Sequence, residues 1–141
     1  MTTTTMQRMS LRLSFIRTAI VINAAVLIWA GAALIVVPDW FYANIGYYPP
    51  FNHHYMGDGG AFQLALGIGL LLTVRHPFRY RLLIAVGAGA SLLHAINHIY
   101  DDVLLHQFAL SQWLVNTWSL LFMAILLIVA VVMSRAEGER A

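Results

Sequence analysis

Four long apolar runs, separated by short polar segments, make up most of the chain. They cover approximately residues 18–37, 55–74, 82–100 and 112–133. Each run is close to the roughly 20 residues that an α-helix needs to cross the hydrocarbon core of a bilayer. Proline lacks a backbone N–H, so we expect Pro38 to end the first helix. The pattern predicts an all-α, four-helix transmembrane bundle that forms a single integral membrane domain over residues 1–141.

The polar segments support this division. Residues 1–17 form a basic lead-in, and the apolar run that follows is longer than the roughly 7–15 residues of a signal-peptide core, so we expect a retained helix. Residues 39–54 form an expected loop rich in Trp and Tyr, which concentrate at membrane–water interfaces. The second and third runs are rich in Gly and Ala, which let helix backbones approach closely in lipid. We therefore expect these two helices to pack as a tight antiparallel hairpin.

Composition narrows the class of protein. The chain is 60% hydrophobic and only 10% charged, whereas a soluble domain is about 25% charged. Its main expected partner is therefore the lipid bilayer. There is no cysteine, which excludes thiolate metal sites and thiol catalysis, and no lysine, which excludes Schiff-base chemistry. A net charge of +2 without a basic stripe predicts no nucleic-acid binding.

The arginines predict the orientation. They precede the first run, lie between the second and third, and follow the fourth: Arg8, Arg12, Arg17, Arg75, Arg79, Arg81, Arg135 and Arg140. The other two connections carry no Arg or Lys. By the positive-inside rule, both termini are expected in the cytoplasm. The expected location is a plasma membrane, as a multi-pass protein of a bacterial inner membrane.

Histidines and acids gather at the opposite, extracytoplasmic end. His94 and His98 are four residues apart, as are His54 and Asp58, so each pair shares one face of a helix. Because the second and third helices run in opposite directions, the two pairs could supply four ligands at similar depth. Helix bundles build metal sites in this way, and three imidazoles with one carboxylate suit Zn, Fe or Mn, while His-rich sets also suit Cu. The sequence thus predicts a metal site of His54, Asp58, His94 and His98.

A purely structural polar network is the main alternative. A hydrogen bond from His94 to Asp58 or Asn116 would satisfy the imidazole without any metal. Of the acids, we expect Asp58 to be buried and paired with a histidine. The remaining polar residues of this end, expected to meet water and lipid headgroups, are His53, Asp101, Asp102 and His106. We interpret Asn23, Gln63, Asn116, Thr117 and Ser119 as helix–helix hydrogen-bonding residues.

Two segments carry a family resemblance: FNHHYMGDGGAFQLALG, and, after an Arg-bearing turn, LLHAINHIYD. They resemble small four-helix bacterial membrane proteins sometimes labelled DoxX-like, over approximately residues 35–105. The pattern is Asn-x-His, an Asp four residues on, a Gly-rich helix, and two His four apart. His54, Asp58, His94 and His98 match it, whereas His53 stands where an acid is expected. The resemblance implies the fold and the residue set but no reaction.

Three functions remain open on the sequence. The first is a metal- or cofactor-binding membrane protein that uses the four residues above, with Zn, Fe or Cu as the candidate metals. The second is an accessory or assembly subunit, docked into a homo-oligomer or a larger membrane complex, whose polar network is structural. The third is a small membrane enzyme that acts on a lipid or quinone, with Asp58 and His98 as an acid–base pair. Whether the protein is an enzyme is therefore open.

Overall fold

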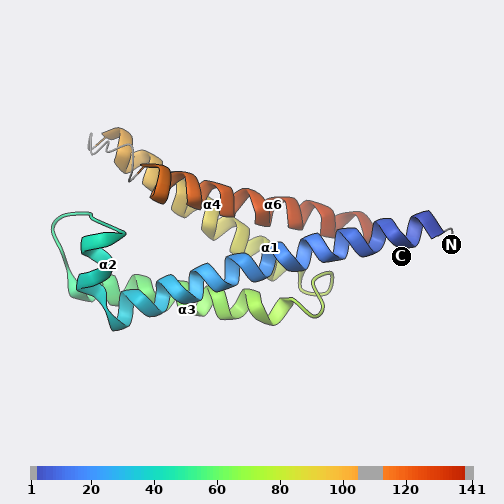
Figure 1. The fold of residues 1–141 in the computed structure, drawn as a ribbon, viewed down its shortest axis with the longest axis horizontal. Helices are drawn as coiled ribbons and strands as arrows, with labels where there is room; N and C mark the ends of the chain where they lie inside the picture. The colour runs from blue at the N-terminus through green and yellow to red at the C-terminus, as the bar shows by residue number, and fades with distance from the viewer. Residues whose placement is uncertain (1–2, 105–112, 139–141) are drawn as a thin grey trace.

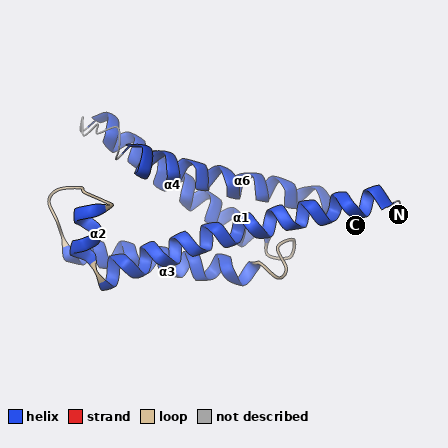
Figure 2. Cartoon of the chain, in the orientation of Figure 1, coloured by secondary structure: helices blue, strands red, loops and turns tan. Residues whose placement is uncertain are grey.

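The computed structural model describes residues 3–104 and 113–138, which form helices joined by loops, without a strand in these ranges (Figure 2). The helices are α1 (Thr3–Val36), α2 (Pro38–Asn44), α3 (His53–Thr73), α4 (Arg81–Leu104), the π-helical η1 (Trp113–Trp118) and α6 (Ser119–Gly138). Three of the described helices are long and apolar enough to cross a membrane, over Met6–Val36, His53–Thr73 and Arg81–Leu104. The apolar part of α6, Ser119–Arg135, is shorter.

The start of the first helix and the loop that follows it differ from the prediction. The basic lead-in is helical, because α1 begins at Thr3. Gly31 is the one glycine in α1, and α1 contains no proline, so little in its sequence disfavours a helix. Pro38 separates α1 from the following segment as expected, but it also begins α2. Proline is favoured in a first helical turn because its missing N–H has no partner there in any case. The aromatic loop is therefore partly helical, and residues 45–52 connect α2 to α3.

Asn52 is the N-cap residue of α3 and fixes where this helix begins. Its side-chain oxygen accepts hydrogen bonds from the backbone N–H groups of His54, at 3.0 Å, and Tyr55, at 3.2 Å. This is the usual role of an Asn at the N-cap, where the first N–H groups lack helical partners. The cap places His54 and Asp58 on regular helix, one turn apart.

The predicted hairpin of the second and third apolar runs is wrong. Instead, α3 packs mainly against α1, and α4 packs mainly against α6. Glycines bring the α1 and α3 backbones together: a Cβ atom added at Gly60 would lie 2.8 Å from the carbonyl oxygen of Gly31, and one added at Gly67 would lie 2.9 Å from the backbone nitrogen of Ile28. These distances are too short for any side chain larger than hydrogen. The small residues of α3 therefore serve its contact with α1.

All four long helices meet at the arginine-rich end. Their shared core contains Ile16 and Ile20 of α1, Leu70 of α3, Ile84 of α4 and Leu127 of α6, all fully buried. Toward the end that carries α2, the α4–α6 pair diverges from the α1–α3 pair (Figure 1). The two helix pairs thus form a structure that is closed by an apolar core at one end and open at the other.

Arg17 adds a polar link at the closed end. Its Nε atom donates to the carbonyl of Val74 at 3.1 Å, and a terminal nitrogen donates to the carbonyl of Arg75 at 3.2 Å. These carbonyls follow the last turn of α3 and have no helical partner, so the guanidinium caps the helix. The contact joins the lead-in to the turn between α3 and α4, which places two of the basic segments side by side.

Candidate functional site

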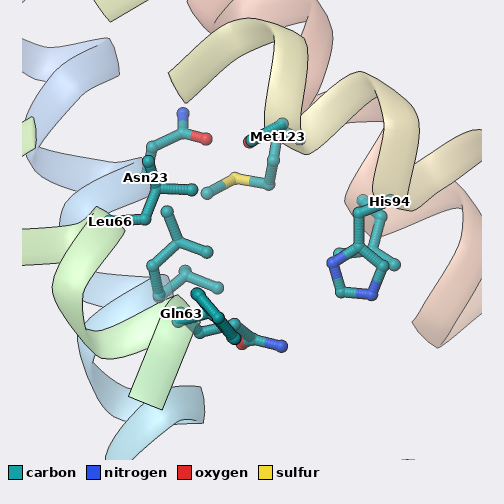
Figure 3. A pocket seen from close by; sticks show the side chains of 11 residues that line it. Asn23, Gln63, Leu66, His94 and Met123 are labelled. Atoms are coloured by element: carbon teal, nitrogen blue, oxygen red, sulfur yellow. The ribbon is translucent and has the colours of Figure 1, made fainter. Parts of the chain in front are cut away.

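A cavity of approximately 150 Å³ lies between the two helix pairs, beyond the apolar core. All four long helices contribute to its wall. The apolar part of the lining comprises Val26, Leu27, Phe62, Leu66, Ala90, Leu120 and Met123. Four polar side chains interrupt this apolar wall, namely Asn23, Gln63, Ser91 and His94. Figure 3 shows that Asn23, Gln63 and His94 reach the cavity from three different helices.

The sequence of α4 explains how an imidazole comes to line this space. Ala90 and Ser91 lie four and three residues before His94, on the same face of the helix, and all three line the cavity. Because the two preceding side chains are small, they leave room beside the larger ring. His94 itself is only partly buried, as its position at the edge of a cavity requires.

His94 is the first residue of a hydrogen-bonded chain that leads from the cavity to the open end. Its Nε2 atom lies 3.0 Å from the Nε2 atom of His98, one turn further along α4. The Nδ1 atom of His98 in turn lies 2.9 Å from the hydroxyl of Tyr48, in the loop between α2 and α3. The Tyr48 ring meets the His98 ring edge-on, at 5.3 Å between centroids. The chain Tyr48–His98–His94 therefore connects the α2–α3 loop with the cavity and bridges the two diverging helix pairs.

The protons in this chain are coupled. Two facing Nε2 atoms can share only one proton, and a neutral imidazole carries one N–H. If Tyr48 donates to His98 Nδ1, then His98 donates through Nε2 to His94, whose own proton must sit on Nδ1. In the reverse arrangement His94 donates to His98, and His98 donates to Tyr48. A proton shift at one end of the chain therefore changes which group donates at the other end.

Tyr48 remains a neutral phenol at ordinary pH. Burial, together with the nearby charges of Asp102 and Asp101, raises the pKa of Tyr48 to about 12. Its hydroxyl consequently keeps its proton and can either donate to His98 or accept from it. The sequence analysis missed Tyr48 because its contact depends on where the loop folds back, and no local pattern encodes that.

The four predicted ligands form two separate pairs. His54 and Asp58 lie 3.4 Å apart, Nε2 to Oδ2, with side chains 79% and 58% exposed. Asp58 precedes Gly60 by two residues, so it lies about 200° around α3 from the glycine that packs on α1. Over residues 3–104 and 113–138, no three His, Asp or Glu side chains are close enough together to hold a metal ion. The single four-ligand site is therefore not assembled in the described part of the chain.

The buried acid of this end is Asp102, and the expectation that it would be Asp58 is wrong. We predicted that Asp102 would lie at a solvated helix end, but α4 continues to Leu104 and Asp102 is only 8% exposed. Its Oδ2 atom accepts a hydrogen bond from the hydroxyl of Thr117 in η1. A signal was present in the sequence, because Asp102 follows His94 and His98 at the same four-residue spacing and so extends one stripe of the helix.

The other predicted polar residues have varied outcomes. Asp101 accepts a hydrogen bond from the Asn97 amide at 3.1 Å, and His53 is exposed. His106 and the side chain of Asn116 lie outside what the structure describes, so the proposed His94–Asn116 contact stays a prediction. Asn23 and Gln63, which we interpreted as helix–helix hydrogen-bonding residues, line the cavity.

Comparisons of the chain with protein-family models, curated protein sequences and solved structures gave no match. The resemblance to small DoxX-like membrane proteins therefore stays a prediction.

Proposed function

We propose that the chain spans a bacterial plasma membrane four times, with its arginine-rich end in the cytoplasm. Three apolar helices of membrane-spanning length support this proposal, together with the apolar part of α6 that runs beside them. The start of α1, the end of α6 and the turn between α3 and α4 lie at the same end of the molecule in Figure 1. The α2 segment at the other end contains no Arg or Lys. This distribution agrees with the positive-inside rule.

The absence of cysteine allows a direct test of this orientation. Ala43→Cys introduces a thiol at an exposed position of α2, and His76→Cys introduces one at an exposed position of the turn after α3. A membrane-impermeant maleimide added to intact spheroplasts should label Ala43→Cys at once and His76→Cys only after permeabilisation. The opposite labelling pattern would reverse the orientation, and labelling of both without permeabilisation would contradict the proposed topology.

We further propose that the protein binds a small hydrophobic molecule in the cavity, where His94 contacts the polar part of that molecule. The observation that carries this proposal is the combination of a mainly apolar space with one imidazole that ends a hydrogen-bonded chain. Ligand sites in proteins have this composition, with a few polar groups fixed in an apolar wall. An apolar cavity of approximately 150 Å³ has the capacity to hold a benzene ring.

This site supports the membrane-enzyme class of function with a different pair of residues. The Asp58–His98 pair that we expected is replaced by His94 and His98, whose shared proton lets His94 give or accept a proton beside the cavity. Lipids and quinones remain the candidate substrate classes, since both reach such a site from within the bilayer.

Filling the cavity tests the binding proposal. Ala90→Leu adds bulk to the cavity wall, whereas Ala65→Leu makes the same change at an exposed position of α3 that does not line it. The protein purified in mild detergent should carry a small hydrophobic molecule that native mass spectrometry detects. Ala90→Leu should lose this molecule, and Ala65→Leu should retain it. Equal loading of all three proteins, or none in the wild type, would contradict the proposal.

A second candidate function is metal binding by the two histidines of α4 alone. Their Nε2 atoms face each other at 3.0 Å, so a small rotation of the rings would place both within ligand distance of one ion. Two protein ligands would leave further positions for water or substrate. Elemental analysis for Zn, Fe and Cu tests this candidate: the wild type should contain stoichiometric metal, and His94→Ala and His98→Ala should both lose it. Unchanged metal content in both variants would exclude this site.

A further inference from the structure

Asn23 presents an unpaired hydrogen-bond acceptor at the cavity. The residue is 1% exposed, and its amide nitrogen donates to the carbonyl of Ala19 at 3.0 Å. Its Oδ1 atom is buried and has no hydrogen-bond partner among the described residues. Asn23 lines the cavity, and Figure 3 shows its amide at the end of the cavity where Met123 also lies.

A buried acceptor without a partner is costly, and natural proteins rarely keep one without a reason. The amide cannot simply be turned over, because its nitrogen already holds the bond to Ala19 and an exchanged oxygen would face a carbonyl. The orientation of Asn23 is thus set by its own helix. Because Asn23 lines the cavity, a molecule bound there can supply the missing donor.

The other residues that line the cavity limit which ligand group can donate to Asn23 Oδ1. A ketone, an ether or a carboxylate can only accept a hydrogen bond, so none of them satisfies Asn23 Oδ1, and a quinone would do so only in its reduced form, which carries hydroxyl groups. An ammonium group can donate, but the acids nearest the open end, Asp101 and Asp102, do not line the cavity and would leave its charge uncompensated there. A hydroxyl donates one hydrogen bond without charge and can accept another from Gln63 or His94 across the cavity.

We propose that the molecule bound in this cavity is recognised through a hydroxyl group on a body the size of one six-membered ring, as in a phenol, and that this hydroxyl donates to Asn23 Oδ1. This inference rests on the proposed binding function and names the chemical class of the ligand. Phe62 and Met123 supply aromatic and thioether surface for the face or edge of such a ring.

Phenol and its methyl ether, anisole, form the matched probes for this proposal, because they share a ring and an oxygen but only phenol donates. The full chain in nanodiscs is titrated with each probe, and binding is followed by saturation-transfer NMR with empty nanodiscs as the partition control. In the wild type, phenol should bind roughly tenfold more tightly than anisole, the effect of one buried hydrogen bond. Asn23→Leu, which keeps the approximate volume, should reduce this ratio to approximately one.

The outcomes separate the ligand class from the binding function. If both probes bind the wild type equally and Ala90→Leu abolishes their binding, the cavity is a binding site but the hydroxyl proposal is overturned. If neither probe binds more to the wild type than to Ala90→Leu, the binding function itself fails. The comparison of phenol with anisole uses the wild-type protein. It therefore tests the proposal even if Asn23→Leu does not fold.

Discussion

The two ends of this helix bundle are built on different principles. At the arginine-rich end, residues from all four long helices close around Leu70 in an apolar core. At the other end the helix pairs diverge, and the described polar chain from Tyr48 through His98 to His94 connects them instead. The cavity lies between these two regions. The apolar core can therefore hold the helices together while the polar end is free to carry the site.

The largest effect should come from the closed end. Leu70→Ala removes a fully buried side chain from the core and should lower the free energy of unfolding by about 2–5 kcal/mol. Leu72→Ala, two residues away at a position that is 72% exposed, should change it by less than about 0.5 kcal/mol. Thermal unfolding of the detergent-solubilised protein measures both. Similar losses in the two variants would contradict the position of the core.

A slightly smaller effect should come from the contact between α1 and α3. Gly60→Ala would place a methyl group 2.8 Å from the backbone oxygen of Gly31, which cannot move aside, and should destabilise the fold by about 3 kcal/mol. Gly59→Ala is the matched control, since nothing lies within 4 Å of a Cβ atom there. The control should be neutral or slightly stabilising because alanine favours the helix. A greater loss in Gly59→Ala than in Gly60→Ala would reverse the assigned packing face.

These glycines also show where sequence reasoning stops. The presence of helices, the break at Pro38 and the one-turn spacing of His54–Asp58 and His94–His98 depend on neighbouring residues, and the structure agrees with them. The choice of packing partner depends on distant residues. A single glycine, Gly31, is a weak sequence signal that α3 packs against α1 and not against the glycine-rich α4. The predicted four-ligand site depended on that choice of partner.

At the open end, we expect the largest loss from the contact between α4 and η1. Thr117→Val keeps the shape of a 2% exposed side chain but removes the hydroxyl that donates to Asp102. Leaving a buried carboxyl oxygen without this bond should cost about 2 kcal/mol of stability. Asn97→Ala, which removes an exposed hydrogen bond to Asp101, should cost less than about 0.5 kcal/mol. Equal effects of the two changes would show that Asp102 is solvated, as the sequence first suggested.

Tyr48→Phe should have the smallest effect on stability, about 1 kcal/mol, because it removes one partly buried hydrogen bond. The wild type should show one tyrosine that ionises at about pH 12, and absorption titration of the variant should lack it. The folded state favours the neutral phenol, so this contribution is fully present below the ordinary pKa of 10.0 and is lost as the pH rises toward 12. An unchanged titration in the variant would place Tyr48 away from His98 and the acids.

The central claim is that His94 and His98 share one proton in a chain that reaches the cavity. Nitrogen NMR of ¹⁵N-histidine-labelled protein in nanodiscs tests it directly, with His94→Gln and His98→Gln used to assign the signals. At neutral pH, we predict a scalar coupling across the hydrogen bond between the two Nε2 atoms, and a shift of the His98 Nδ1 signal in Tyr48→Phe. Two uncoupled imidazoles whose signals do not respond to Tyr48→Phe would contradict the account.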